Sequence, residues 1–307
     1  MSGNDAQVPW TDDQWNTVNR AVQDTARKAR VASSFLPLVG PLPSSVTTVP
    51  AQRMSNADLG DAQRGEARAR LVIEEADVLG LTTISSEVYL KNSEATDPDL
   101  SSAIAMLCRA ADVIARVEDA VVFNGLPSAD SDSYPGAGRV PAHNGTPIVT
   151  PMIYRVKGGT PNGGLLDAEL KATVPKEGEP GDGIVRAVVD AIQQLEGQGH
   201  YGPFACVLGN ALFLDANTPS RGSLVLPSDR ITPFLNGPLL RSSTVPASAG
   251  VVVALAGDPI DLVVATDITA KFLQLSVEPR YVFRVYERIA LRIKQPAAAC
   301  RLTSARK

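Results

Sequence analysis

The sequence predicts an α+β fold, and three observations carry that prediction. Apolar residues recur at helical spacing from Asp99 to about Phe123. Short apolar runs separated by Gly, Pro and Asp fill the C-terminal half, and a long alternating segment, YVFRVYERIALRI, covers Tyr281 to Ile293. Helical spacing indicates amphipathic helices, whereas alternation and short apolar runs indicate strands. A mixed sheet with helices on its flanks satisfies all three patterns.

Composition excludes several classes of protein. The chain has 307 residues, of which 44% are hydrophobic, and a net charge of -4, so it can bury a substantial core. Such a small net charge gives no reason to expect general nucleic-acid affinity. The N-terminal segment MSGNDAQVPWTDD is polar and acidic, unlike a secretory signal, and the apolar runs are shorter than the roughly 20 residues of a membrane span. We therefore expect a cytoplasmic protein without a membrane partner.

The first predicted helix runs from about Asp12 to Arg30. Thr11 and Gln14 have the spacing of a capping box, in which side chains satisfy two N-terminal amide groups. One face of this helix carries Trp15, Val18, Val22, Ala26 and Ala29. An apolar stripe of this width is buried either in the chain's own core or against a partner, and the sequence leaves both alternatives open.

A second helix, from Asp99 to about Phe123, is the most strongly patterned element. Its buried face would contain Ile104, Leu107, Ala111, Ile114, Val117 and Val121. Gly125 ends it, and the following segment LPSADSDSYPGAGRVPAHNGTP is rich enough in Pro, Gly, Ser and Asp to predict a loop or ribbon. Asp182 is placed to cap a third helix, which would continue to the Gly-Gln-Gly at 197–199.

The segment between the first two helices is predicted to be extended. Four prolines in SSFLPLVGPLPSSVTTVP remove backbone donors and favour an extended connector. Residues from about Val46 to Leu90 then mix charges of both signs with too few apolar side chains for a separate core. Because an isolated hairpin is only marginally stable in water, we interpret this segment as a two-stranded arm that lies on a neighbouring subunit.

Five short apolar runs, FACVLG, LVLP, GVVVALAG, IDLVVAT and FLQLSV, are predicted to form strands. In the final strand, one face would carry Phe283, Val285, Ile289, Leu291 and Ile293, and the other Arg284, Tyr286, Arg288 and Arg292. The arginine row of Arg284, Arg288 and Arg292 would meet either nucleic acid or carboxylates. Because Arg suits bidentate pairing with carboxylates, we favour an intersubunit contact for this row.

Signs of an enzyme are weak. The sequence contains no Gly-x-Ser-x-Gly, no phosphate-binding Gly-Lys-Ser/Thr loop, no His-Glu-x-x-His and no dinucleotide fingerprint. The acidic pairs Glu74 with Glu75 and Glu118 with Asp119 are adjacent, so on a helix their side chains would diverge into solvent. We predict no catalytic residue and no cofactor, and keep an enzyme as the alternative from another class of protein.

Cysteine and histidine usage argues against a metal site. Cys108, Cys206 and Cys300 are far apart and odd in number, which favours buried thiols over a disulfide framework or a zinc site. His143 and His200 each lack a second nitrogen or sulfur ligand nearby in the sequence. We therefore predict no bound metal.

Five segments, in chain order, resemble one known family. They are WTDDQW with the helix that follows it, FLPLVGPL, ARVEDAVVFNG at 115–125, HYGPFACVLG and the closing VYERIALRIKQPAA. Together they are similar to the shell proteins of encapsulins, bacterial compartments built on the Hong Kong 97-like capsid fold of tailed bacteriophages. Phe204 stands where the family usually has tyrosine, and residues 288–291 depart from its aromatic and threonine pattern. The resemblance implies a structural protein whose function is self-assembly.

The resemblance also implies a subunit with a peripheral domain, an extended arm and an axial domain. The corresponding ranges are 1–45 for the N-terminal helix and connector, 46–90 for the arm, 91–125 for the long spine helix, 126–267 for the axial domain with an insertion at about 126–182, and 268–307 for the closing strands of the peripheral domain. Such a chain would assemble into an icosahedral homo-oligomer of on the order of sixty copies, or a simple multiple.

Two further sites follow from the same resemblance. An interior groove would bind a short targeting peptide of an encapsulated cargo protein through Trp15, Val18, Val22 and Phe35. A loop of Thr218, Pro219, Ser220 and Arg221 would line a pore at the five-fold axis, where Arg221 would set a positive field for small anions. A plain solvated loop is the alternative for these four residues.

A phage or prophage capsid protein that encloses DNA is the nearest alternative, because it would share the fold. Its inner surface would be strongly basic, whereas this chain is mildly acidic overall. The charge therefore argues against nucleic acid as a partner. Nuclease-resistant nucleic acid inside purified particles would favour the capsid alternative.

Overall fold

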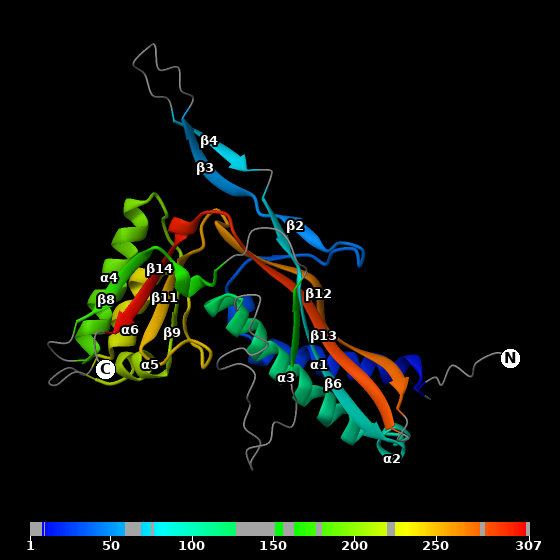
Figure 1. The fold of residues 1–307 in the computed structure, drawn as a ribbon. Coiled ribbons are helices and arrows are strands. Elements are labelled where there is room, and N and C mark those ends of the chain that lie inside the picture. Colours follow the sequence, from blue (N-terminus) through cyan, green and yellow to red (C-terminus); the bar gives the residue numbers. More distant parts are fainter. Residues whose placement is uncertain are drawn as a thin grey trace.

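The computed structural model describes residues 8, 10–58, 69–74, 77–126, 151–155, 163–175, 180–219, 225–276 and 280–304. These residues form two five-stranded sheets, each packed against helices, and an arm of paired strands that projects from them (Figure 1). The predicted α+β class is therefore confirmed. Short connecting elements are α2 (Asn92–Ala95) and the 3-10 helices η1 (Ala32–Ser34), η2 (Leu165–Asp167) and η3 (Pro296–Ala298).

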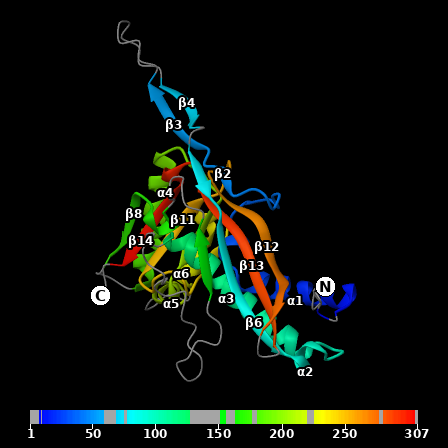
Figure 2. The same ribbon diagram turned by 45° about the vertical axis from the view of Figure 1, so that its right-hand side comes forward.

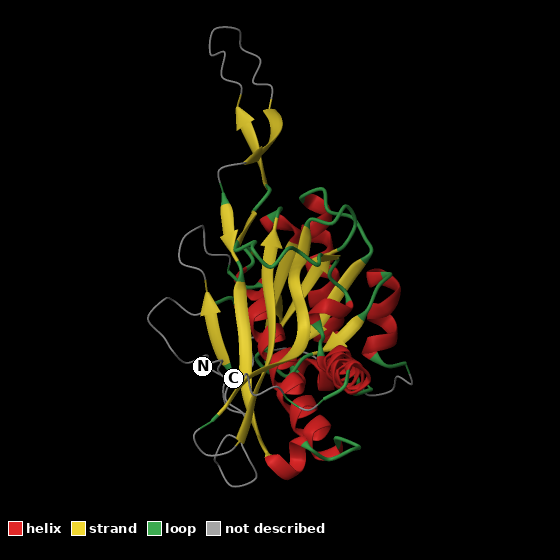
Figure 3. Ribbon diagram, turned by 90° about the vertical axis from the view of Figure 1, so that its right-hand side faces the viewer, coloured by secondary structure: helices red, strands yellow, loops and turns green. Residues whose placement is uncertain are grey.

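The first sheet has the strand order β1-β12-β13-β6-β7. Its strands are β1 (Leu38–Val39), β12 (Ile260–Leu275), β13 (Arg280–Ile293), β6 (Thr82–Lys91) and β7 (Met152–Arg155), and only β1 pairs in parallel. The helices α1 (Asp12–Ala29) and α3 (Ser101–Asn124) pack against this sheet and each other. Figure 3 shows the strands with the helices to one side. Val18 of α1, Ile114 of α3 and Phe283 of β13 share one hydrophobic core.

The second sheet has the order β10-β9-β11-β14-β8. Its strands are β10 (Leu239–Arg241), β9 (Phe204–Leu208), β11 (Ala249–Ala254), β14 (Ala299–Ser304) and β8 (Leu170–Val174), and the helices α4 (Pro180–Gly197), α5 (Asn210–Ala216) and α6 (Pro227–Leu235) pack around it. Every residue of β9 and β11 is buried. Burial on both faces explains why these strands appear in the sequence as continuous apolar runs.

Two helix predictions are confirmed and one needs correction. Gln14 donates its backbone amide to Thr11 Oγ1 at 3.3 Å and accepts the Thr11 amide at 2.9 Å, which completes the capping box. The helix α3 ends at Gly125, whose φ of 76° favours glycine. The predicted start of the third helix is wrong, because α4 begins at Pro180 and Asp182 pairs with Arg230 of α6.

One strand prediction is wrong, one segment of the predicted arm lies in a sheet, and two predicted strands are joined into one. The run LVLP is not a strand where it is described, because Leu226 is the extended N-cap of α6 and Pro227 its first residue, where proline loses no helical hydrogen bond. The segment LTTISSEVYL, assigned to the arm, forms β6 between β13 and β7. The runs IDLVVAT and FLQLSV belong to one long strand, β12, which is interrupted by register shifts.

The arm contains two antiparallel pairs. The strand β2 (Thr48–Pro50) pairs with β5 (Val78–Gly80), and β3 (Arg53–Asp58) pairs with β4 (Ala69–Glu74). In Figures 1 and 2 the β3-β4 pair extends away from both sheets. Its base packs in a small second core of Val49, Ala51, Leu79, Leu81, Val263, Ala265 and Ala290. The arm is therefore anchored at one end.

Candidate assembly surfaces

The base of the arm is fixed to the body through the backbone. The Met54 amide donates to the Lys294 carbonyl at 2.9 Å, just after β13, while within the arm the Ala51 amide donates to the Asp77 carbonyl at 2.8 Å. Further out, Val72 and Ile73 of β4 are exposed, by 38% and 51%. Apolar side chains left in solvent on a projecting ribbon are typical of surfaces that contact another chain.

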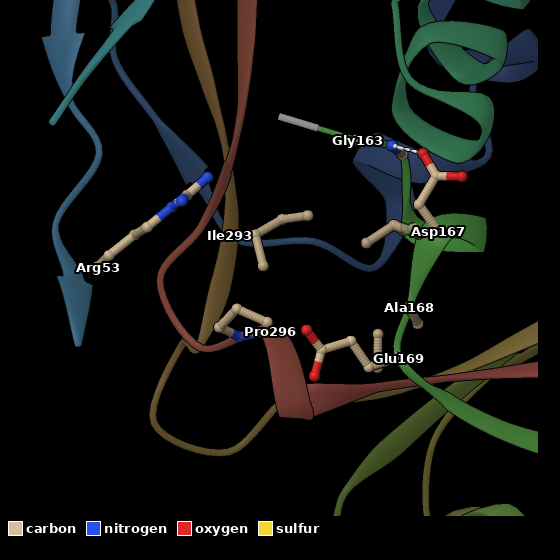
Figure 4. Close-up of a pocket in the computed structure, with 10 residues that line it drawn as sticks. Arg53, Gly163, Asp167, Ala168, Glu169, Ile293 and Pro296 are labelled. Atoms are coloured by element: carbon tan, nitrogen blue, oxygen red, sulfur yellow. Dashed lines mark hydrogen bonds between the residues drawn. The ribbon is translucent and has the colours of Figure 1, made fainter. Parts of the chain in front are cut away.

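A small pocket lies where the arm meets the two sheets. Its volume is about 150 Å³, and Figure 4 shows Arg53 of β3 reaching toward Ile293, with Glu169 beside Pro296 on the other side. Asp167 also lines it. Its described lining contains no nucleophile paired with a base, and no cluster of metal-ligating side chains occurs among the described residues. The pocket is a junction between segments of the chain.

The face of the first sheet that bears Arg284 carries a second exposed patch. Tyr89 of β6, and Met152 and Tyr154 of β7, are exposed by 47%, 46% and 68%. Arg284 donates to Glu87 Oε1 at 2.8 Å, and Tyr89 donates its hydroxyl to Glu87 Oε2 at 2.9 Å. The hydrogen bond from Arg284 lowers the pKa of Glu87, and that from Tyr89 adds to it. We name the surface of Tyr89, Met152, Tyr154, Glu87 and Arg284 the exposed sheet face.

The three arginines of the row, Arg284, Arg288 and Arg292, do not share one surface or one kind of partner. The Arg292 side chain is only 10% exposed, and its Nε and Nη2 donate to the two carboxylate oxygens of Asp261 at 2.8 and 2.7 Å. This bidentate pair lies within the chain, so the assignment of Arg292 to an intersubunit contact is wrong. Arg288 donates to the carbonyl groups of Ser44 and Val46 in the connector. Arg284 alone remains 39% exposed beside its carboxylate.

The predicted cargo groove is largely closed within the subunit. Val18 and Val22 are fully buried in the main core, so packing on the chain's own domain is the correct alternative for them, and their assignment to peptide binding is wrong. Trp15 and Phe35 stay partly exposed at the edge of the same core. The Trp15 ring lies 6.1 Å from Phe283 and the Phe35 ring 6.5 Å from Phe123, measured between centroids.

The predicted pore loop is only partly described. Thr218 and Pro219 are exposed beyond the end of α5, and the Thr218 hydroxyl donates to Leu214 at 2.8 Å. Ser220 and Arg221 lie outside the described residues. The proposed pore and its positive field therefore stay predictions.

A buried charge cluster of Arg30, Glu118 and Glu287 was missed by sequence reasoning. Arg30 follows α1, and its guanidinium lies 2.6 Å from Glu118 Oε2 on α3 and 2.6 Å from Glu287 Oε2 on β13. Asp267, in a bulged part of β12, approaches the same guanidinium at 2.8 Å. Next to Glu118, Asp119 accepts the amides of the connector. The cluster ties four segments of the first sheet's domain together.

These carboxyl groups have unusual proton affinities. Burial raises the pKa of Glu118 well above its ordinary value, and the neighbouring Glu287 adds to the rise. Burial likewise raises the pKa of Glu287 to about 7, against the lowering effect of Arg30. The pKa of Asp119 is also raised by burial to about 7, although the Ala32 amide opposes the shift. The expectation that Glu118 and Asp119 are solvated is thus wrong.

Solved structures with the same fold are capsids. A virus-like particle from Pyrococcus furiosus matches 94% of this chain and 98% of its own chain, with a TM-score of 0.66 at 14% identity. The capsid of the Myoviridae phage XM1 matches 89% and 91%, with a TM-score of 0.57 at 12% identity. The fold is therefore the Hong Kong 97-like capsid fold.

Sequence comparison defines the family. The family model described as "Encapsulating protein for peroxidase" matches residues 4–138 and 153–290, so the chain belongs to this family of encapsulin shell proteins. The type 1 encapsulin shell protein EncA of Myxococcus xanthus is 27% identical, over 98% of this chain and 96% of that protein. A diheme-cytochrome-encapsulin shell fusion protein of Kuenenia stuttgartiensis is 25% identical, over 94% and 72%. The chain is a structural shell protein that assembles with copies of itself.

Among the helices that the structure describes, none combines the length and the apolar character that crossing a membrane requires.

Proposed function

We propose that this protein forms a closed icosahedral shell in the cytoplasm, of on the order of sixty copies or a simple multiple, around a cargo protein. The observation that supports this most strongly is the family match, which extends over residues of both sheets and the arm. The relatives' names describe encapsulating shells. Closed symmetry allows individually weak contacts between copies to act together.

The arm is the proposed connection between copies. Val72 and Ile73 on the arm, and Met152 and Tyr154 on the exposed sheet face, are apolar surfaces left in solvent by the single subunit. A standard protein interface buries about 1,600 Å² in total, and a ribbon lying across a neighbour's sheet adds such area without enlarging the subunit core. In this proposal Arg284, with its half-exposed pair to Glu87, lies at the contact.

Cargo binding is proposed to use the edge of the main core. Trp15 and Phe35 present partly exposed rings there, and an apolar peptide would gain free energy by covering them. Val18 and Val22 would pack in the core beneath these rings and would not contact the peptide. The cargo itself is a protein that carries a short targeting segment.

Electron microscopy and sedimentation of the purified protein test this function. We expect hollow closed particles that contain a co-purifying protein, identified by mass spectrometry after the particles are washed and opened. Nuclease treatment separates the two shell functions, because an encapsulin keeps its content after digestion of free nucleic acid and contains no protected DNA. Protected DNA inside the particles would instead support the capsid alternative.

A further inference from the structure

The buried charge cluster contains more negative than positive charge. Glu118 and Glu287 have side-chain exposures of 1% and 0%, and they face a single guanidinium, that of Arg30. Full ionisation would leave one buried carboxylate uncompensated, and an unpaired buried charge is among the most costly groups in a protein. The partly exposed Asp267 adds a further negative charge from β12.

Three carboxylate oxygens in the cluster make no hydrogen bond. Glu118 Oε1, Glu118 Oε2 and Glu287 Oε1 are buried without a hydrogen-bond partner in the described structure, and both carboxyl groups lie 2.6 Å from the same guanidinium. A carboxylate can only accept, whereas a protonated carboxyl can also donate. A proton on one of the two groups would therefore supply the donor that the ionised pair lacks, as in other sites where two carboxyls share a proton.

In the described part of the chain, Glu118 and Glu287 have no cation beside them other than Arg30. On α3, Asp119 lies next to Glu118, and it accepts the amides of Val31 at 3.0 Å and Ala32 at 2.7 Å. On β6, the residue paired with Glu287 is the uncharged Ile84. Arg284 and Arg288 of β13 bond to Glu87 and to the connector carbonyls, on the opposite face of the strand. Among the described residues, Arg30 is thus the one cation that contacts Glu118 and Glu287.

We propose that this cluster is an acid-tightened clasp, in which a proton shared by Glu118 and Glu287 locks the end of α1 and the connector onto α3 and β13. Loss of the proton loosens that lock. The clasp lies inside one subunit, so it does not depend on which cargo the shell holds or on the number of copies.

The direction of the pH effect follows from proton linkage. A solvated glutamate has a pKa of about 4.3, whereas burial raises the pKa of Glu287 to about 7 in the folded subunit. The stabilisation is therefore complete below the solvated value and is lost as the pH rises through about 7. Between these values, each proton held only by the closed state changes the opening equilibrium about tenfold per pH unit.

Hydrogen exchange in the assembled protein tests the clasp. The Val31 and Ala32 amides donate to Asp119 in the closed state, so their protection factors report opening. After correction for intrinsic exchange, we expect protection to fall from about pH 5 to about pH 7, by about tenfold per pH unit for each proton that only the closed state holds, and then to level off. Infrared spectroscopy should show the C=O band of a protonated carboxylic acid near neutral pH.

Isosteric variants separate the clasp from general pH effects. In Glu118→Gln the amide donates permanently, so the connector should lose less protection between about pH 5 and about pH 8 than in the wild type. Glu287→Gln should behave alike, and both should weaken the infrared band, to which Asp119 also contributes because burial raises its pKa to about 7. Glu196→Gln, at an exposed position of α4, should keep the wild-type slope.

Three results would overturn the clasp. They are wild-type protection that does not change with pH, protection that increases toward alkaline pH, and an unchanged slope in both glutamine variants. Should one glutamine variant fail to assemble, the other variant and the infrared band of the wild type decide the question.

Discussion

At the scale of single residues, Arg292 of β13 and Asp261 of β12 form a buried ion pair at one end of the first sheet. Their side chains are 10% and 2% exposed, and both hydrogen bonds are shorter than 3 Å. Asp261 also lies 3.0 Å from Lys294 Nζ, so removing Arg292 takes away two charge-assisted hydrogen bonds and one of the two cations beside this buried carboxylate. Arg292 is therefore structural, although the alternating pattern places it on the same strand face as the partly exposed Arg284.

We expect Arg292→Ala to lower the free energy of unfolding by about 1.5–3 kcal/mol, because its charge-assisted hydrogen bonds are lost while Lys294 still faces Asp261. Arg116→Ala is the control, because Arg116 makes a half-exposed pair with Asp112 at 3.2 Å, and such pairs contribute less than about 1 kcal/mol. Urea unfolding followed by circular dichroism measures both at one protein concentration, since assembly adds to apparent stability. Equal losses in the two variants would contradict the structural role of Arg292.

Gly40 occupies a position in the connector that only glycine suits. Its φ is 147°, and a Cβ there would collide with the carbonyl oxygen of Val264 on β12. We expect Gly40→Ala to cost about 1–3 kcal/mol or more in unfolding free energy. Gly197→Ala at the end of α4 meets no atom within 4 Å and should be neutral or slightly stabilising. A thermal melt of each variant checks the contrast, and an unperturbed Gly40→Ala would refute it.

The sequence could have indicated part of the charge cluster. On the buried face of β13, Phe283, Val285 and Ile289 alternate, and Glu287 falls between the last two. A charged residue at a core position requires a partner, and this gap in the apolar pattern was the available signal. Its partners, Arg30 and Glu118, are distant in sequence, so no local pattern could have identified them.

At the scale of elements, length decided what the sequence could predict. The helices α1 and α3 have 18 and 24 residues, and their long periodic faces predict them well. The helices α5 and α6 have seven and nine residues, too few for a clear period, and a proline in α6 suggests a turn. The strand β6 was assigned to the arm because its pairing with β13 joins residues far apart in the chain, which local spacing does not reveal.

The arm is the element with the most specific prediction. Replacing residues 53–74 by a short turn removes β3 and β4 but none of the residues of the main core. We expect the shortened subunit to stay folded, with circular dichroism close to that of the full chain, and to fail to form closed particles. A control that replaces only Val72 and Ile73 with Thr keeps β propensity and should weaken assembly less. Normal particles from the shortened chain would exclude the arm as a connection between copies.

At the scale of the whole molecule, the subunit combines a well-buried body with a projecting arm and an exposed sheet face. Such a shape is poorly suited to a solitary protein and well suited to a closed shell, where the exposed apolar surfaces of one copy meet those of the next. The order of elements could be predicted from segments that resemble the family, because those segments lie along the whole chain. The contacts between copies could not, since they depend on surfaces that no single chain brings together.

Sedimentation velocity of the purified protein at near-neutral pH, paired with electron microscopy of the same fraction, tests the central claim most directly. We predict a single fast-sedimenting species whose images are closed hollow shells, with little free subunit. A stable, folded 32.4 kDa monomer as the main species, with no closed particle, would contradict the account.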